Sequence, residues 1–357
     1  MRVLIINSGS SSIKYKLFEM PKESLLTNGT LEHIGEKGAR IRNHRDGLRI
    51  ILSKINDVWL IGHRVVHGAE EFRKPVLIDD AVINKIRHCN ILAPLHNPAN
   101  LEGILACKSL LPGVKQIAVF DTAFHQTLPE YAYIYGLPYA YYKEYGVRKY
   151  GFHGTSHEYV AFEAAKLLKK PFNKLRIITC HLGNGCSIAA VKNGESVDTS
   201  MGFTPLEGLV MGTRCGDMDP ALVTYIMRQE KLNIAQMETI LNKASGLKGI
   251  SGISNDMRVL QGKASSGNKK AKLAIDIFVY RIKKYIGAYA GIMSGCDALV
   301  FTAGIGENQE FIRKMVCDGL FSHFKKKPRI LVVPTNEELL IARKAFGLIR
   351  SKRDILG

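Results

Sequence analysis

One pattern occurs twice in this chain, and it constrains the fold more than any other feature. Residues 3–13, VLIINSGSSSI, combine an apolar run, a turn of small residues and a second strand that opens with Ser-Ile. Residues 177–188, IITCHLGNGCSI, repeat this order near the middle of the chain, with turns that differ in length by one residue. A repeat at this distance indicates two related halves rather than a solenoid. The sequence therefore predicts a duplicated fold.

Strand-like and helix-like segments alternate along most of the 357 residues. This alternation favours an α/β architecture in which helices cover a sheet, and the length suggests two domains. The expected strands span residues 3–6, 13–18, 58–62, 116–121, 176–181, 187–191, 298–304 and 329–333. The expected helices span residues 80–88, 97–111, 156–169, 220–228, 234–245, 269–293, 310–320 and 337–346.

The charge of the chain is strongly positive, with 50 Lys and Arg against 32 Asp and Glu, a formal net charge of +18. Such a surplus favours anionic partners, which include nucleic acids, membrane surfaces and phosphorylated metabolites. The lysines are scattered and lack interleaved aromatic residues, so they do not form the pattern of a nucleic-acid-binding module. A solvated basic surface is the favoured interpretation.

Cysteine usage and hydropathy indicate the compartment. The seven cysteines form no C-x-x-C pair, which favours buried free thiols over a disulfide framework or a zinc ribbon. The apolar run at the N-terminus is too short for a signal peptide, and no clean run of about eighteen apolar residues is present. These features predict a cytoplasmic protein.

Both repeated turns have the composition of a phosphate-binding loop. In the first turn Gly9 permits a positive φ, and small polar residues expose hydroxyl, amide and backbone N–H donors. In the second turn, residues 181–185, two glycines let the backbone approach a ligand closely. A plain hairpin turn is the alternative for either turn alone, but the pair favours a polyphosphate site. The donors of the first turn are Asn7, Ser10, Ser12 and Lys14.

A third glycine-containing segment, residues 302–308 (TAGIGEN), follows an apolar strand and is expected to be a turn before a helix from about Gln309. Gly304 and Gly306 would suit a nucleotide that packs against backbone at a helix N-terminus. The segment matches neither a Walker A pattern nor a full G-x-G-x-x-G. Taken alone, this signal is weak.

Two arginines lie in glycine-flanked loops, Arg64 in GHRVVHG and Arg214 in GTRCGD. A guanidinium group in a tight loop after a strand can bind carboxylate or phosphate oxygens through two hydrogen bonds. A surface salt bridge is the alternative for each.

Two histidines in GFHGTSHE lie four residues apart, a spacing that suggests zinc. However, Thr155 and Glu158 have the spacing of a capping box, so the helix should begin after His153 and the two rings should not share a helical face. His153 is then placed to donate a hydrogen bond to a charged ligand. His96, in PLHNP, would do the same or cap a helix.

Two carboxylates stand at positions that suit a divalent cation. Asp121 ends an expected strand, and Glu337 opens the last expected helix. Single carboxylates with bound water suit Mg²⁺ that carries nucleotide phosphates. For Glu337 the alternative is favourable placement at a helix N-terminus, which applies equally to Glu338.

Together these segments resemble the acetate kinases of the acetokinase family, within the sugar kinase, Hsp70 and actin superfamily. The resemblance covers nearly the whole chain and depends on the motifs occurring in order. They are NSGSSSIKY, GHRVVHG, LAPLHNPAN, FDTAFH, YGFHGTSH, HLGNGCS, VDTSMGFTPLEGLVMGTRCGD, ISNDMR, FTAGIGEN and VPTNEE.

The resemblance implies a duplicated ribonuclease H-like βββαβαβα fold with two domains around a nucleotide cleft. The implied N-terminal acetokinase lobe comprises residues 1–125 and a C-terminal helix, 338–357, and the nucleotide-binding lobe comprises residues 126–337. The implied reaction is reversible, Mg²⁺-dependent phosphoryl transfer between ATP and acetate that gives acetyl phosphate and ADP, with Mn²⁺ as an alternative ion. A homodimer through the C-terminal lobe is also implied, with no nucleic-acid or membrane partner.

The resemblance assigns roles to residues that match the family's motifs. The implied catalytic residues are Arg64, Asp121, His153 and Arg214. The implied acetate-binding residues are Arg64, Val66, Leu95, His96, Phe152 and Pro205. The implied nucleotide-binding residues are Asn7, Ser10, Ser12, Lys14, His181, Leu182, Gly183, Asn184, Gly185, Asp256, Met257, Arg258, Gly304, Ile305, Gly306 and Asn308. The implied metal-binding residues are Asn7, Asp121 and Glu337.

This assignment agrees with the chemistry of phosphoryl transfer, which needs positioning and neutralisation of charge rather than covalent catalysis. A carboxylate is already a competent nucleophile, so no general base is required. The positive charge would come from the two arginines, His153 and the metal ion.

The chain departs from the family in three respects. Cys186 and Cys215 replace small residues near the implied site, and the chain is shorter than typical members before Val58 and between Leu320 and Arg329. The charge of +18 has no family explanation.

Two other functions remain open. Propionate or butyrate kinase is the first, and Val66 argues weakly for acetate, since one methylene changes specificity only about 10–200-fold. The second, from another class, is a non-catalytic, basic nucleotide- or nucleic-acid-binding protein.

Overall fold

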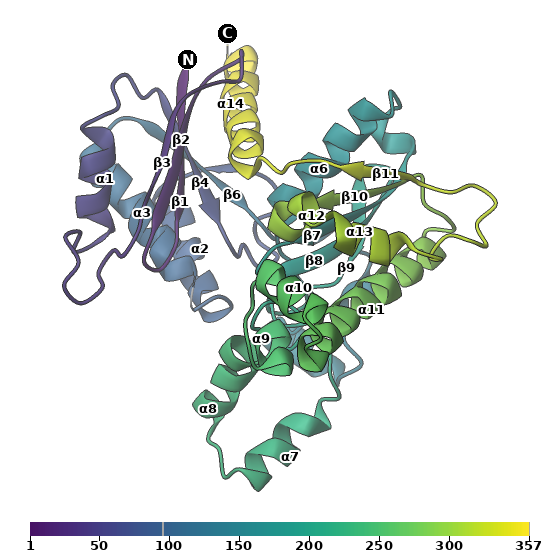
Figure 1. The fold of residues 1–357 in the computed structure, drawn as a ribbon. Coiled ribbons are helices and arrows are strands. Elements are labelled where there is room, and N and C mark those ends of the chain that lie inside the picture. Colours follow the sequence, from purple (N-terminus) through teal and green to yellow (C-terminus); the bar gives the residue numbers. More distant parts are fainter. Residues whose placement is uncertain (95, 357) are drawn as a thin grey trace. The chain divides into compact units, whose positions relative to one another are not determined.

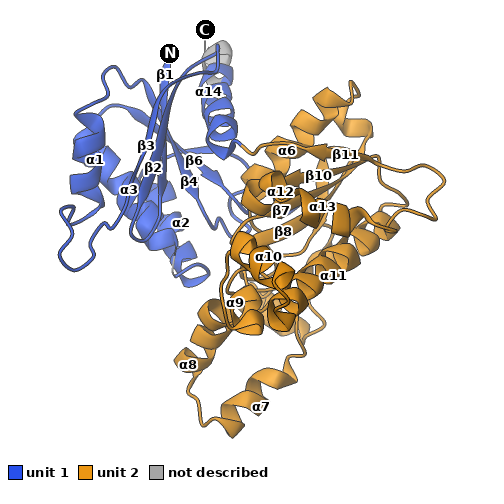
Figure 2. Ribbon diagram, viewed as in Figure 1, with its two compact units in different colours: residues 1–126, 336–357 blue, residues 127–335 orange. Residues whose placement is uncertain are grey.

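The computed structural model describes residues 1–94 and 96–356, and the chain divides into two compact units (Figures 1 and 2). Unit 1 comprises residues 1–126 and 336–357, and unit 2 comprises residues 127–335. Unit 1 contains β1 (Arg2–Ser8), β2 (Ile13–Glu19), β3 (Ser24–Leu31), α1 (His44–Leu52), β4 (Leu60–Val65), β5 (Val76–Leu77), α2 (Asp80–His88), η1 (Cys89–Ile91), α3 (Asn97–Leu110), β6 (Lys115–Phe120) and α14 (Glu337–Leu356). The short helix η2 (Ala123–Thr127) spans the boundary.

Unit 2 follows the same mixed α/β plan with more helices. Its first elements are α4 (Glu130–Tyr133), α5 (Tyr139–Tyr145), α6 (Gly154–Leu167), η3 (Phe172–Lys174), β7 (Arg176–Leu182), β8 (Cys186–Lys192), β9 (Glu195–Thr199) and α7 (Ala221–Gln229). They are followed by α8 (Ile234–Thr239), η4 (Ile240–Ala244), α9 (Gly246–Ser251), α10 (Met257–Ser265), α11 (Lys269–Ile292), β10 (Ala298–Thr302), α12 (Ala303–Asn308), α13 (Glu310–Cys317) and β11 (Arg329–Val332).

The two sheets share one strand order. The sheet of unit 1 runs β3-β2-β1-β4-β6-β5, and the sheet of unit 2 runs β9-β8-β7-β10-β11. In each, the first three strands form antiparallel pairs and the next two add in parallel, while β5 is an extra antiparallel edge strand of unit 1. The predicted duplication and α/β fold class are therefore confirmed.

The repeated turns occupy equivalent places in the two sheets. The β1–β2 ladder closes at the pair Ser8 and Ile13, and the β7–β8 ladder closes at Leu182 and Cys186. The first turn therefore has residues 9–12 and the second has residues 183–185, which confirms the predicted difference of one residue.

The central strand β1 of unit 1 is buried on both faces, as its near-continuous apolar sequence requires. Residues 3–6 of β1 are at most 1% exposed. Helices α1 and α3 pack together and contribute to a core cluster with β1, β2 and β4, and α14 packs against β1, β4 and β6. Gly62 in β4 permits this close approach, because a Cβ there would lie 2.7 Å from Ile5 Cδ1 and 3.0 Å from Ile341 Cγ2.

Several elements differ from the sequence expectations. Strands β3, β5 and β9 and helices α1, α4, α5, α9 and α10 were not expected. The expected strand over 298–304 ends at Thr302, and the expected turn over 302–308 is largely the short helix α12. Helix α12 forms because Glu307 Oε1 accepts hydrogen bonds from Thr302 Oγ1 and from Ala303 N, at its own N-terminus.

All seven cysteines are free thiols, and five of them are buried, as predicted. Within the part of the chain that the structure describes, no helix is long and apolar enough to cross a membrane.

Two buried histidines are expected to make unit 1 sensitive to acid. Burial lowers the pKa of His63 from 6.5 to about 4, although a hydrogen bond with Gln116 opposes this, and burial lowers the pKa of His67 from 6.5 to about 4. The unfolded chain therefore takes up protons near pH 6.5 while the folded chain does not. Stability is complete above about pH 6.5 and falls as the pH drops toward about 4, by up to about 3 kcal/mol for each histidine.

Urea unfolding at about pH 7 and about pH 4.5 measures this loss. The variant His63→Gln removes one titrating ring and retains a polar group near Gln116. It should show a smaller fall in unfolding free energy than the wild type, and an identical fall would contradict the assignment.

Candidate active site

Three strands of unit 1 bring polar side chains to one edge of the sheet. Strands β1, β4 and β6 are parallel neighbours, so their carboxyl ends lie together, the place where ligands bind in open α/β sheets. Asn7 lies near the end of β1, Arg64 near the end of β4, and Asp121 directly after β6. Glu337, the first residue of α14, joins them.

The four side chains meet around the guanidinium group of Arg64. Its Nε lies 3.2 Å from Asp121 Oδ1 and 3.4 Å from Glu337 Oε2, its Nη2 pairs closely with Asp121 Oδ2, and its Nη1 lies 3.4 Å from Asn7 Oδ1. The side chains of Arg64 and Asp121 are 18% and 1% exposed. The surface salt bridge considered for Arg64 is therefore a largely buried ion pair.

Electrostatics keep this arginine charged. Burial disfavours its charge, but attraction to Asp121 and Glu337 outweighs burial and raises the pKa of Arg64 above its usual value. The neighbouring Glu338 points elsewhere and pairs with Lys16 Nζ at 2.9 Å. The structure thus separates the two glutamates that the sequence left equivalent.

Two asparagines on α3 hold the backbone around Arg64, and the sequence interpretation missed both. Asn97 accepts from His67 N and donates to His67 O, at 3.0 and 2.9 Å. Asn100 accepts from Val66 N at 3.0 Å and donates to Ser8 O at 2.6 Å. The feature of the sequence that could have identified them is a pair of asparagines three residues apart at the start of a mostly apolar helix.

The first turn is held from both sides. Gly9 N donates to Ser12 O at 2.8 Å, and His44 Nε2 lies 2.7 Å from Gly9 O. Gly9 does not use the positive φ that glycine permits. A Cβ at this position would lie 2.9 Å from Ser12 Oγ, so a larger residue would have to displace that side chain. Ser10 and Lys14 are exposed beside this turn.

In unit 2 a histidine cluster lies behind the second turn. His153 is the N-cap of α6 with a left-handed φ of 55°, a conformation that is strained for a non-glycine residue. The predicted capping box is wrong, because Thr155 is the second residue of the helix. The helix begins after His153, as predicted, so His153 lies outside it. The two rings nevertheless meet at one hydroxyl, because His153 Nδ1 and His157 Nε2 lie 2.9 and 2.7 Å from Ser187 Oγ.

His181 completes the cluster. Its ring stacks on that of His153, with ring centroids 4.2 Å apart. Its Nδ1 lies 2.8 Å from Ser156 Oγ, which lies 2.8 Å from Thr335 Oγ1. This network fixes the rings on β7 and α6.

Arg214 lies next to His153 at the second turn. A Cβ on Gly185 would lie 3.4 Å from Arg214 Nη1 and 3.5 Å from His153 Cε1. Both side chains therefore lie close to the backbone of the turn at Gly185. Burial lowers the pKa of Arg214, an effect that Cys186 opposes. Cys186 supports the turn by donating to Gly183 O at 3.1 Å, and burial raises the pKa of its thiol to about 12.

Asp217 closes the loop that carries Arg214. Its backbone N donates to Gly208 O at 2.9 Å, and its Oδ1 accepts from Gly208 N at 2.8 Å. Its Oδ2 accepts from Tyr285 Oη of α11 at 2.6 Å. Arg214 Nη1 donates to Pro205 O at 3.3 Å in the same segment.

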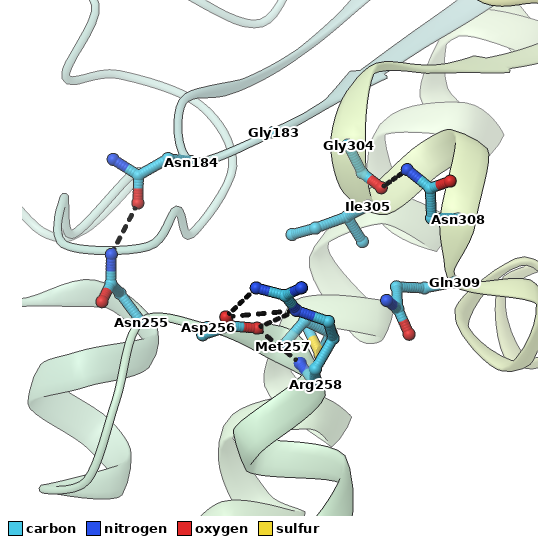
Figure 3. Close-up of a pocket in the computed structure, with 10 residues that line it drawn as sticks. All are labelled: Gly183, Asn184, Asn255, Asp256, Met257, Arg258, Gly304, Ile305, Asn308 and Gln309. Carbon is cyan, nitrogen blue, oxygen red and sulfur yellow. Dashed lines mark hydrogen bonds and ion pairs between the residues drawn. The ribbon is translucent and has the colours of Figure 1, made fainter.

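Unit 2 also contains a cavity of about 410 Å³, shown in Figure 3. Asp256 and Arg258 pair within it, and the Arg258 side chain lowers the pKa of Asp256 to about 2. Asn255 Nδ2 donates to Asn184 Oδ1 at 2.9 Å, and Asn308 Nδ2 donates to Gly304 O at 2.9 Å. The lining residues are Gly183, Asn184, Asn255, Asp256, Met257, Arg258, Gly304, Ile305, Asn308 and Gln309.

Eight of the predicted nucleotide-binding residues line this cavity: Gly183, Asn184, Asp256, Met257, Arg258, Gly304, Ile305 and Asn308. Asn255 and Gln309 were not predicted. His181, Leu182, Gly185 and Gly306 do not line it. Gly304 and Gly306 lie inside α12, whereas the sequence interpretation placed them before a helix.

The predicted acetate-binding residues divide between the units. Val66 in unit 1 and Phe152 in unit 2 are 6% and 2% exposed, and Pro205 is half-buried. His96 is the N-cap of α3 and makes no side-chain capping hydrogen bond. Leu95 lies outside the described residues.

The oxygen donors around Arg64 fit a hard divalent cation. Two carboxylates and one amide oxygen already face a positive group, and these are the ligand types that Mg²⁺ takes, with water and phosphate completing its shell. Among the side chains that the structure describes, no group of three or more His, Cys, Asp or Glu is arranged to hold a metal.

Known proteins resemble this chain over its whole length. The model of the acetokinase family matches residues 2–325. An acetate kinase of Carboxydothermus hydrogenoformans is 48% identical over 399 aligned positions, which cover 99% of this chain and 100% of that protein. The alignment is longer than the 357 residues here, so the relative contains segments that this chain lacks.

Solved structures agree. The crystal structure of Porphyromonas gingivalis acetate kinase has a TM-score of 0.92 and 44% identity, covering 98% of this chain and 99% of that one. A propionate kinase from Francisella tularensis has a TM-score of 0.91 and 41% identity, covering 97% and 99%. The chain, with its duplicated sheet and its arginine and carboxylate cluster, belongs to the acetokinase family.

Proposed function

We propose that this chain catalyses reversible phosphoryl transfer between ATP and acetate, giving acetyl phosphate and ADP. The observation that carries the proposal is the convergence of Asn7, Asp121 and Glu337 on Arg64 at the carboxyl edge of a sheet, in a member of a family of carboxylate kinases. Anionic oxygens that surround a buried cation form a site for charged phosphate chemistry.

The nucleotide is assigned to the cavity of unit 2. Its volume of about 410 Å³ is within the range of small-molecule sites, about 300–1,000 Å³. Gly183 and Gly304 let the backbone lie close to the ligand, and Ile305 offers an apolar surface to the adenine. Arg258 supplies positive charge at the cavity wall. The turn of residues 183–185 then faces the phosphates.

The phosphoryl group is assigned to the arginines and His153. The acetate carboxylate attacks the γ-phosphorus in line, the bond to the β–γ bridging oxygen breaks, and ADP leaves with that electron pair. Arg64 and Arg214 neutralise the charge on the equatorial oxygens, and His153 donates a hydrogen bond to one of them. No side chain needs to remove a proton, because acetate is ionised at neutral pH.

The metal is assigned to Asn7, Asp121 and Glu337, with Mg²⁺ as the ion and Mn²⁺ as an alternative. When bound, it neutralises nucleotide phosphate oxygens. These residues hold it through oxygens that Arg64 contacts in the present structure. We also propose a homodimer through unit 2, which sedimentation equilibrium would test against the 39.6 kDa monomer mass. A cytoplasmic location remains a prediction.

The experiment is to trap acyl phosphate with hydroxylamine in the presence of ATP, Mg²⁺ and acetate, propionate or butyrate in turn. We expect the highest kcat/KM with acetate, and about a 10–200-fold change for each added methylene. Highest activity with propionate would favour the second candidate, which similarity to a propionate kinase supports. No acyl phosphate from any of the three acids would reject both. A nucleic-acid-binding protein would instead be retained on DNA with a steep salt dependence.

A further inference from the structure

Three hydrogen bonds link His153 to the interior of unit 2. Ser187 Oγ on β8 lies 2.9 Å from His153 Nδ1 and 2.7 Å from His157 Nε2. The other nitrogen of His157, Nδ1, lies 2.7 Å from Thr179 Oγ1 on β7. Thr179, His157 and Ser187 are each 0% exposed. Water therefore does not decide which atoms carry the hydrogens of these three hydrogen bonds.

Thr179 determines which group donates and which accepts in each of these hydrogen bonds. Its hydroxyl has one hydrogen, and within residues 1–94 and 96–356 its only hydrogen-bond partner is His157 Nδ1. If Thr179 accepted from that nitrogen, its own buried hydrogen would have no acceptor, which is costly. Thr179 therefore donates, and His157 Nδ1 accepts.

The remaining hydrogens follow in sequence. A neutral His157 that accepts at Nδ1 carries its hydrogen on Nε2 and donates it to Ser187 Oγ. The single hydroxyl hydrogen of Ser187 then points to its second partner, His153 Nδ1. His153 consequently accepts at Nδ1, and in its neutral form its hydrogen lies on Nε2.

The Nε2 edge of His153 faces the second turn. A Cβ on Gly185 would lie 3.6 Å from His153 Nε2 and 3.4 Å from Arg214 Nη1, so the two donors point toward the same place. The stacked His181 ring, with its centroid 4.2 Å away, restricts rotation of the imidazole.

We propose that Thr179, His157 and Ser187 form a buried hydrogen-bond relay that fixes the tautomer of His153, so that its Nε2–H is directed at the transferring phosphoryl group. This rests on the proposed function, in which His153 is the catalytic donor. The other three are positioning residues. No proton is transferred, because the relay only determines which nitrogen of His153 carries the hydrogen. A donor held in place costs no reorganisation when charge develops on the phosphoryl oxygens.

Two substitutions at one position separate this role from packing. Thr179→Val keeps the volume and removes the hydroxyl, whereas Thr179→Ser keeps the hydroxyl and removes a buried methyl group. The relay predicts that Thr179→Val lowers kcat by about 10-fold or more while KM for ATP changes by less than about 3-fold. Thr179→Ser should stay within about 3-fold of the wild-type kcat. A packing role predicts the opposite order.

The tautomer itself can be read without activity. Long-range ¹H–¹⁵N correlation spectra of ¹⁵N-histidine-labelled protein show which ring nitrogen carries hydrogen, and His153→Gln assigns the His153 signals. We expect the Nε2–H tautomer in the wild type and in Thr179→Ser, and a mixture in Ser187→Ala, with kcat of the latter about 10–100-fold lower.

The relay would be overturned if His153 of the wild-type protein carried its hydrogen on Nδ1. It would also be overturned if the Thr179→Val variant were as active as the Thr179→Ser variant. If Thr179→Val does not fold, the wild-type spectrum and Ser187→Ala still decide. Failure of the proposed function can be distinguished from failure of the relay. In the first case the wild-type protein forms no acyl phosphate, whichever nitrogen of His153 carries the hydrogen.

Discussion

Replacing Arg214 with alanine is expected to lower kcat for acyl phosphate formation by about 10³-fold and to leave the fold intact. Among the described residues, no carboxylate pairs with its guanidinium, whose side-chain contacts are Pro205 O at 3.3 Å and Met211 Sδ at 3.8 Å. Burial lowers its pKa, and Cys186 opposes this effect only in part. A desolvated cation with no anionic protein partner is arranged for an anionic ligand.

Steady-state kinetics with hydroxylamine trapping measure the effect, and urea unfolding checks stability. The matched control is Arg176→Ala, also in unit 2, which removes an ion pair with Asp297. Arg176 is the first residue of β7, at the end of the strand away from the second turn. It should reduce stability and leave kcat within about 3-fold of wild type. If Arg214→Ala retained more than about a tenth of wild-type kcat, Arg214 would not be a catalytic residue.

The fold was predictable where the sequence pattern is local and apolar. Strands β1 and β7 are continuous apolar runs, and helix α2 matches the expected span of 80–88. Strand β3 was missed because its sequence, SLLTNGTL, is mostly exposed and contains a turn-like Asn-Gly, so only pairing with β2 makes it a strand. Helix α12 was missed because two glycines lower its helix propensity, and Glu307 compensates at its N-terminus.

The site was predictable where a charge or a glycine marks it. Arg64 was identified from its glycine-flanked segment, although it lies inside β4 and not in the expected loop. Asp121 and Glu337 were identified from a strand end and a helix start, and the three residues lie together in unit 1. Neutral groups were missed, because Asn97, Asn100 and Ser187 acquire their role only from partners far away in sequence. The capping-box spacing at Thr155 misled for the same reason: the N-cap is His153, which the histidine network holds, two residues earlier.

The catalytic roles and the metal site remain proposals, and Asp121 provides the sharpest test of both. Replacing Asp121 with asparagine is expected to raise the Mg²⁺ concentration for half-maximal activity more than about 10-fold and to lower kcat by about 10²–10³-fold. Asparagine keeps the shape and one oxygen acceptor for Arg64 but removes the negative charge. Glu337 would then be the only anionic metal ligand of the three proposed.

Loss of the charge has a second consequence in unit 1. The guanidinium of Arg64 would retain only Glu337 as an anionic partner, and removing one partner of a buried ion pair costs about 3–5 kcal/mol at most when nothing replaces it. Because asparagine still accepts a hydrogen bond, we expect a smaller loss of unfolding free energy. Urea unfolding without nucleotide therefore reports the ion pair, and Mg²⁺ titration of activity reports the metal.

The matched control is Glu338→Gln, one residue beyond the proposed ligand Glu337, which removes a carboxylate that pairs with Lys16 instead of Arg64. It should change neither the Mg²⁺ dependence nor kcat by more than about 3-fold. If Asp121 served only to hold Arg64, then Asp121→Asn would lower kcat with an unchanged Mg²⁺ dependence, as Arg64→Ala should. That result would remove Asp121 from the metal site and leave Arg64 as the group through which it acts.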